Sequence, residues 1–304
     1  MSRLTTLSLA VLCACTGGDQ PRSSTLGQGS GAPLVYVTNY PLEYFAQRIG
    51  GGIVQIEFPM AGGGDPAFWQ PDAETIRRMQ SADIILTNGA TYERWLDQVT
   101  LPTRRIVNTS AAFADQYLEV TGSVTHTHGP EGEGSDEGTA FTTWLDPAFA
   151  VLQAEAIAES FSERWPTNAA AFEANMTAVR TDLERLDRDL RDATNALREV
   201  PLVASRPVYQ YLAARYGLDI ESVTWEPDTM PSERAWRAVR DLRRRHAASW
   251  MIWETEPTPE IADRLREFGM EPVVVAPLGD RPKQGDYLDG MAANIERLGT
   301  LPSP

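Results

Sequence analysis

The segment "NAAAFEANMTAVRTDLERLDRDLRDATNAL" (residues 168–197) carries one hydrophobic stripe along its whole length. Its apolar residues recur at alternating intervals of four and three, which places them on one face of an α-helix. Charged residues fill the opposite face. We therefore predict a long helix lying along a hydrophobic core, and we favour this over a coiled-coil dimer. The stripe consists of Phe172, Met176, Val179, Leu183, Leu186, Leu190, Ala193 and Leu197.

On both sides of this helix, short β-rich runs alternate with helical patterns, which is typical of parallel sheets covered by helices. The pattern predicts an α/β fold of two lobes with parallel sheets flanked by helices, joined by a long rigid helix. Strands are expected at 34–38, 54–58, 84–87, 105–108, 201–204, 220–224, 249–253 and 271–275. The other helices are expected at 41–49, 72–80, 91–98, 147–165, 208–216, 232–246, 257–268 and 287–298.

The bulk composition limits the classes of function. With 304 residues and 42% hydrophobic content, the chain is long enough for two packed lobes. Its formal net charge of −15 argues against nucleic-acid binding, because a phosphate-binding surface must be locally basic. We expect a monomer that binds no nucleic acid.

The N-terminus has the features of an export signal. Arg3 supplies a positive charge, and the apolar run at 4–12 is too short to span a bilayer as a helix. Ala14 before Cys15 resembles a bacterial lipobox, which predicts a signal peptide over 1–15 and lipidation at Cys15. An ordinary signal peptide cut at a small-residue site is the alternative. We expect an exported, lipid-anchored chain on the periplasmic or cell-surface side of a bacterial membrane.

The segment 16–32 is small, polar and nearly free of apolar residues, so we interpret it as a flexible tether. Beyond it the chain has no cysteine, no Gly-x-Ser-x-Gly elbow and no His-Glu-x-x-His helix. We therefore do not expect an enzyme.

Six segments of the body, taken in order, resemble the metal-binding lipoproteins of zinc and manganese ABC importers. The resemblance runs from about residue 34 to 298. It implies two α/β lobes joined by a long helix, a metal ion between the lobes, and the permease and ATPase of a metal importer as partners. The segments are "VYVTNYPLEYFAQRIGG" (35–51), "DPAFWQPD" (65–72), "ADIILTNGATYERWLD" (82–97), "TTWLDP" (142–147), "YQYLAARYGL" (209–218) and "GDYLDGM" (285–291).

The resemblance also identifies four positions where the family carries metal ligands, and this chain substitutes all four. Ala67 replaces the histidine of a Pro-His-x-aromatic-Glu-Pro segment, and Thr142 replaces the histidine before Trp-Leu-Asp-Pro. Arg206 stands where a histidine follows the second lobe's first strand, and Ala276 where a carboxylate follows its last strand. Alanine offers no donor atom, threonine is a poor zinc ligand, and arginine adds a permanent positive charge. We expect a degenerate or rebuilt cleft site.

Four carboxylates remain near the implied cleft. Glu254 follows an expected strand, and Asp65, Glu226 and Asp228 are further candidates. For each of them, a solvated loop carboxylate or a salt bridge is the more frequent role. Arg206 and Glu254 are expected at adjacent strand ends of one lobe, so a charge pair could replace the metal there.

Two histidines lie in a glycine-rich acidic loop at 122–140. His126 and His128 could share a zinc ion with nearby carboxylates, although ordering such a loop costs entropy and weakens the site. A degenerate solvated loop is the alternative. The candidate metal residues are thus His126, His128 and Glu254, with zinc as the metal. His246 ends an arginine-rich helix and is interpreted as a C-terminal helix cation, not a ligand.

Together these features predict an extracytoplasmic substrate-binding lipoprotein of a zinc-type metal ABC importer. The alternative is a non-transport binding or scaffold relative whose cleft holds no metal. The expected organisation is a signal peptide (1–15), a tether (16–32), an N-terminal lobe (33–145), a helical linker (146–199) and a C-terminal lobe (200–304).

Overall fold

The computed structural model describes residues 31–60, 66–120 and 138–301. Within these residues, two four-stranded sheets are formed, and all neighbouring strands in each sheet are parallel. The first has the order β2-β1-β3-β4 and the second β10-β9-β7-β8. The strands are β1 (Leu34–Val37), β2 (Gln55–Glu57), β3 (Ile84–Thr87), β4 (Ile106–Asn108), β7 (Leu202–Ala204), β8 (Ile220–Ser222), β9 (Trp250–Trp253) and β10 (Glu271–Val274).

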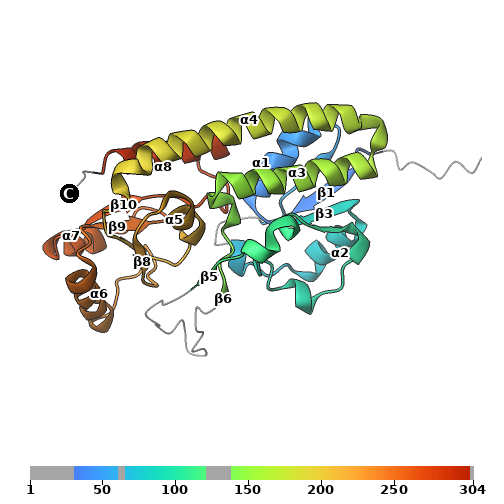
Figure 1. The fold of residues 1–304 in the computed structure, drawn as a ribbon. Coiled ribbons are helices and arrows are strands. Elements are labelled where there is room, and N and C mark those ends of the chain that lie inside the picture. Colours follow the sequence, from blue (N-terminus) through green and yellow to red (C-terminus); the bar gives the residue numbers. More distant parts are fainter. Residues whose placement is uncertain (1–30, 61–65, 121–137, 302–304) are drawn as a thin grey trace, which may run out of the picture. The chain divides into compact units, whose positions relative to one another are not determined.

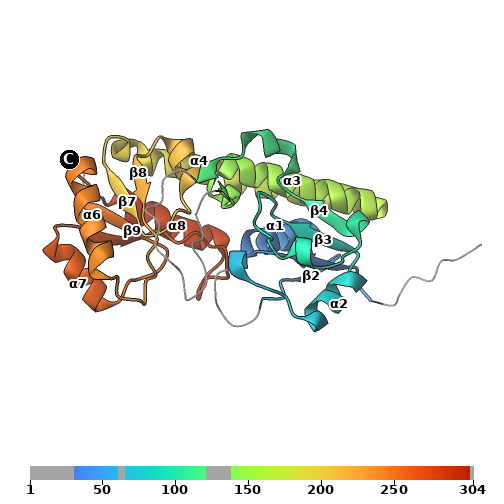
Figure 2. The ribbon, with the colours of Figure 1, turned by 90° about the horizontal axis from the view of Figure 1, so that it is seen from below.

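Helices cover both sheets, so the central strands are largely buried and, apart from Thr87 at the end of β3, apolar, as is typical of parallel sheets. Figure 2 shows each sheet with its own set of helices. All helices are close to their expected positions except one. They are α1 (Tyr40–Gly50), α2 (Ala73–Ser81), α3 (Pro147–Arg164), α4 (Ala169–Thr194), α5 (Gln210–Tyr216), α6 (Glu233–His246), α7 (Pro259–Glu267) and α8 (Tyr287–Gly299).

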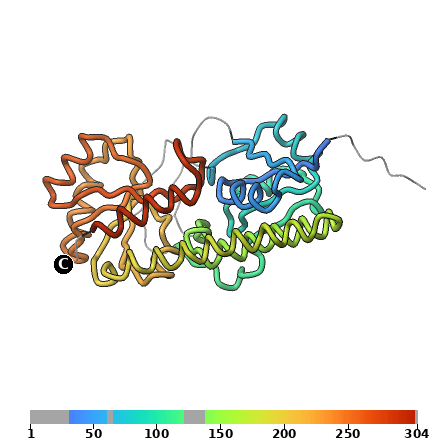
Figure 3. The backbone as a smooth tube through the Cα atoms, turned by 90° about the horizontal axis from the view of Figure 1, so that it is seen from above, coloured from blue at the N-terminus to red at the C-terminus, as the bar shows by residue number. Residues whose placement is uncertain are grey.

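The long helix α4 joins the two lobes. Its apolar face is buried from Phe172 to Leu190, and it packs against α1 and α3 of the first lobe and α8 of the second. Figures 1 and 3 show it running along both lobes. The predicted fold is therefore confirmed. The α-helix ends at Thr194 and continues as a 3₁₀ turn over Asn195–Leu197.

The prediction of a helix at 91–98 is wrong. Ala90 and Thr91 have positive φ angles of 49° and 62°, and only a 3₁₀ turn at Leu96–Gln98 forms there. The carboxylate of Glu93 accepts hydrogen bonds from the backbone N–H groups of Asn88 and Gly89, which folds the chain back on itself. A short antiparallel hairpin, β5 (Glu119–Val120) with β6 (Gly138–Thr139), was not expected either.

Among the described residues, no helix is both long enough and apolar enough to span a bilayer.

Candidate functional site

The four substituted positions lie in segments that meet where the two lobes face each other. Thr142 Oγ1 donates a hydrogen bond to the carbonyl of Val208, 2.6 Å away and two residues beyond Arg206. Trp144 Nε1 donates to the carbonyl of Pro277 at 2.6 Å, next to Ala276. The Arg206 guanidinium lies 5.5 Å from the ring centre of Phe68, which follows Ala67. We call this region the lobe junction.

The sheet of the second lobe places Arg206 beside Glu254. Strands β7 and β9 are neighbours, with Ala204 opposite Ile252, so the residues that follow them emerge at the same edge. Arg206 Nε lies 3.3 Å from Glu254 Oε1, and the side chains are only 15% and 21% exposed. The expected charge pair is confirmed. Glu254 is thereby engaged with a cation that the protein itself supplies.

The other three positions carry no side chain suited to a metal ion. Ala67 is buried in a 3₁₀ turn, and Ala276 is fixed through its backbone, whose N–H and carbonyl both bond to the Asn294 side chain. Thr142 is buried, and its hydroxyl group donates a hydrogen bond to the carbonyl of Val208. The hydroxyl of Thr142 and the backbone groups of Ala276 are therefore hydrogen-bonded within the protein.

Phe68 adds a contact between the lobes. Its ring is 55% exposed, and the guanidinium of Arg94 lies 5.6 Å from its centre, in addition to that of Arg206. Such cation–π contacts at exposed sites contribute about 0.5–1 kcal/mol each. A cavity of about 250 Å³ lies at Phe68, and its lining also includes Ala67, Trp69, Gln70, Arg94, Trp95 and Gln98.

Tyr209 contributes a buried hydrogen bond near the lobe junction, and it could not be identified from the sequence. Its hydroxyl donates to the carbonyl of Val275 at 2.7 Å. Burial raises the pKa of Tyr209 well above its usual value, and the negative charge of Glu254 adds to this effect. The phenol therefore stays protonated and acts as a donor that ties β7's loop to the end of β10.

Sequence reasoning also missed a buried polar network at the carboxyl ends of the first-lobe strands. Glu93 accepts hydrogen bonds from Thr38 Oγ1 and from the N–H groups of Asn88 and Gly89, at 2.6, 2.6 and 3.1 Å. Burial nevertheless raises the pKa of Glu93. The Asn88 side chain is in turn bound by Gln153 from α3. The network fixes the strand ends on which the junction rests.

The remaining candidates do not form a metal centre within the described residues. Nowhere in residues 31–60, 66–120 and 138–301 do three or more His, Cys, Asp or Glu side chains gather as a metal would require. Glu226, Asp228 and Glu254 are therefore not a three-ligand site, because their side chains are not grouped; Asp228 is exposed. Asp65, His126 and His128 lie outside the described residues.

His246 closes α6 in the last turn, as expected, but it is buried. Its Nε2 lies 2.9 Å from the carbonyl of Leu202, and its Nδ1 is 3.6 Å from Glu221. These contacts attach the end of α6 to the sheet, so His246 has a structural role.

Comparison with known proteins gives one family match. The chain matches the family described as "Zinc-uptake complex component A periplasmic" over residues 35–300. It is 26% identical to the zinc-binding lipoprotein AdcA of Streptococcus pneumoniae over 96% of this chain, although it spans only 60% of that protein's length. It is 22% identical to the manganese ABC transporter substrate-binding lipoprotein PsaA of Streptococcus mitis, over 96% of this chain and 94% of that protein.

Solved structures share the fold. The metal-dependent lipoprotein YcdH from Bacillus subtilis superposes with a TM-score of 0.74 and 21% identity, covering 88% of this chain and 98% of that one. Zn(II)-bound AdcA from Streptococcus pneumoniae gives 0.72 and 21%, covering 88% and 57%. FpvC from Pseudomonas aeruginosa, in complex with Mn²⁺, gives 0.72 and 20%, covering 88% and 98%. At these sequence identities, the comparison with solved structures shows a shared fold and nothing further about function.

Proposed function

This chain belongs to the family of periplasmic zinc-uptake complex component A proteins, and from that membership we propose that it is the extracytoplasmic substrate-binding component of a metal ABC importer. Zinc is the default cargo, and the site at the lobe junction is degenerate or rebuilt. The family is one of solute-binding proteins, not of enzymes. The partners under this proposal are the permease and ATPase of the importer.

The observation that carries the degenerate site is the ion pair between Arg206 and Glu254. A cation bound at this place would meet a permanent guanidinium charge and would compete with it for the carboxylate of Glu254. Withdrawing Glu254 from Arg206 to bind a cation costs free energy, because the poorly exposed guanidinium is left without its counter-charge. Binding at the junction in the family's manner is therefore disfavoured.

The second candidate function is a non-transport binding or scaffold protein whose junction holds no metal. It is favoured by the direct contacts between the lobes, namely Thr142 with Val208 and Phe68 with Arg206. These contacts bridge the lobes without a metal ion. A metal is then not needed to hold the two lobes together.

Zinc calorimetry on protein lacking residues 1–15 separates the two functions. The importer proposal expects a weak binding event that uses the loop histidines, with Glu254 as a further candidate ligand. Replacing both His126 and His128 by alanine should abolish it, and His246→Ala serves as the histidine control. Tight binding that survives the double replacement would place the cargo site elsewhere. No heat of binding in the unaltered protein would favour the scaffold function.

We attribute membrane attachment to a lipid on Cys15, with 16–32 as the tether. Cys15→Ser should release the protein from the membrane fraction, whereas Cys13→Ser, two residues earlier, should leave it attached. Unchanged membrane association of the Cys15 variant would refute the lipobox interpretation.

A further inference from the structure

Helix α6 concentrates positive charge in a chain whose formal net charge is −15. It begins at Glu233 after the N-cap residue Ser232, whose hydroxyl accepts a hydrogen bond from the Ala235 N–H, and it buries Trp236, Val239 and Leu242 against the second sheet. Its arginines occupy the exposed side. They are Arg234, Arg237, Arg240, Arg243, Arg244 and Arg245.

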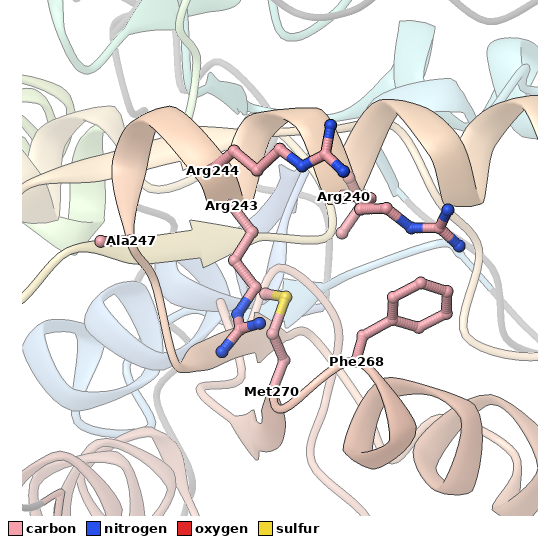
Figure 4. A pocket seen from close by; sticks show the side chains of 7 residues that line it. Arg240, Arg243, Arg244, Ala247, Phe268 and Met270 are labelled. Carbon is pink, nitrogen blue, oxygen red and sulfur yellow. The ribbon is translucent and has the colours of Figure 1, made fainter.

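A cavity of about 330 Å³ opens between the C-terminal half of α6 and the turn after α7. Arg240, Arg243 and Arg244 line it together with Phe268 and Met270. Figure 4 shows Arg240 beside Phe268 and Arg243 extending toward Met270. The volume is at the lower end of what small-molecule sites occupy.

The turn after α7 is shaped around the Arg243 guanidinium. Gly269 has a φ of +71°, and a Cβ at this position would lie 2.8 Å from Arg243 Nη2. Phe268 stacks on Trp236 with ring centres 5.2 Å apart, and this contact positions the Phe268 ring on one side of the cavity. The wall of the cavity is therefore rigid and partly apolar.

Of the three arginines that line the cavity, Arg244 pairs with Asp241 on its own helix at 3.5 Å. On the opposite side, Arg245 pairs with Glu221 at 2.7 Å. In the part of the chain that the structure describes, neither Arg240 nor Arg243 forms an ion pair. Arg240 lies 5.0 Å from the centre of the Phe268 ring, and Arg243 Nε donates to the carbonyl of Ala248 at 3.2 Å.

Stabilisation of the helix end does not explain this arrangement. Cations in the last turn are favoured by the partial negative charge of the helix C-terminus, which accounts for Arg243, Arg244 and Arg245. Arg240 lies a turn earlier, where this effect has faded. A planar fork of donors suits a phosphate or similar oxyanion, which arginine binds in a bidentate manner.

We infer that this cavity binds a phosphate-type oxyanion, held by Arg240 and Arg243, with Phe268 and Met270 contacting an apolar part of the same ligand. The phosphate group can belong to a soluble small molecule or to a lipid headgroup. The site is on α6 and the turn after α7, so it is separate from the lobe junction and independent of metal cargo.

Two probes test the site and distinguish the sources. Inorganic phosphate is titrated into the protein and followed by amide chemical shifts of α6, and co-sedimentation is measured with vesicles of phosphatidylglycerol or of phosphatidylcholine. The variants are Arg240→Gln with Arg243→Gln, and the control is Arg237→Gln, which removes an exposed arginine of the same helix that does not line the cavity. Thermal unfolding confirms that each variant folds.

We expect the double variant to weaken binding of the effective probe about tenfold or more, while the control changes it less than twofold. Binding of free phosphate identifies a soluble ligand; binding only to phosphatidylglycerol vesicles identifies a headgroup. If the control variant loses as much as the double variant, the effect is general surface charge and the site is refuted. Failure of both probes to bind at low ionic strength, where such contacts are strongest, also refutes it.

Discussion

At the scale of single residues, Arg206 and Glu254 form an ion pair of 3.3 Å at the edge of the second sheet where β7 and β9 end. The pairing of Arg206 with Glu254 could be predicted, because parallel strands in one lobe bring their carboxyl ends to the same edge. The roles of Tyr209 and Glu93 could not. Each depends on burial and on partners far away in the chain, such as Val275 and Thr38, and the sequence does not place these partners.

Glu254→Gln tests the ion pair. It should lower the free energy of unfolding by about 2–4 kcal/mol, because it leaves the poorly exposed guanidinium of Arg206 without its counter-charge. Urea unfolding gives the measurement. Glu226→Gln, which alters a partly exposed carboxylate of the same lobe, should stay within about 0.5 kcal/mol. Equal effects from the two variants would show that the pair contributes no stability.

At the scale of elements, the strong hydrophobic periodicity of α4 made this helix predictable. The helix predicted at 91–98 does not form, because side-chain hydrogen bonds stabilise a turn there. The stripe in α4 specifies a helix because all its large apolar residues fall on one face. At 91–98 the apolar spacing was suitable as well. The contacts of Glu93 with Asn88 and Gly89 outweighed helical propensity and folded the chain into a turn.

Asp187 fastens α4 to α5. It accepts hydrogen bonds from Arg215 and Tyr216, with distances of 2.9–3.0 Å. Burial acts to raise the pKa of Asp187, but these hydrogen bonds and the charge of Arg215 outweigh it and hold the pKa below its usual value. A carboxyl with a lowered folded-state pKa adds stability above its unfolded pKa of about 4 and loses it as the pH falls further.

Asp187→Asn should therefore lower the free energy of unfolding at pH 7 by about 1.5–3 kcal/mol, as expected for hydrogen bonds to a charged group. The difference from the unaltered protein should shrink as the pH falls from 5 to 3. Denaturant unfolding over this pH range gives the measurement. Asp192→Asn, an exposed change on the same helix, is the control. A difference that stays constant down to pH 3 would mean that the charge of Asp187 is unimportant.

At the scale of the whole folded body, the two lobes are linked by more than α4. The segment between β10 and α8 crosses to the first lobe, where the carbonyl of Gly279 accepts from the N–H of Tyr40 at 2.9 Å. Arg281 donates to both carboxylate oxygens of Glu43 on α1, at 2.6 and 2.5 Å. Two lobes and a joining helix were predictable from the sequence. This crossing segment was not, because its residues carry no periodic pattern.

Arg281→Ala should loosen this link. The Glu43 side chain is only 4% exposed, so losing its cation should cost about 2–4 kcal/mol of unfolding free energy. Hydrogen exchange of the α1 amides should also become faster. Lys283→Ala, in the same segment and exposed, is the matched control. Unchanged exchange in α1 would show that the ion pair does not couple the lobes.

Under the proposed function, Arg206 is the residue that opposes a cation at the lobe junction. At an effective dielectric constant of about 20, a guanidinium about 4 Å from a divalent ion repels it by roughly 8 kcal/mol, before relaxation and water reduce the effect. Even a small part of this repulsion exceeds the ~1.4 kcal/mol that changes affinity tenfold.

The decisive measurement is calorimetric titration of zinc into the unaltered protein, Arg206→His and Arg206→Ala. Arg206→His removes the repulsion and supplies the ligand type that the resemblance implies at this position, whereas Arg206→Ala only removes the repulsion. We predict that Arg206→His raises zinc affinity about tenfold or more over the unaltered protein and that Arg206→Ala raises it less. If the unaltered protein already binds zinc as tightly as Arg206→His, Arg206 does not oppose the cation and the degenerate-site account is wrong.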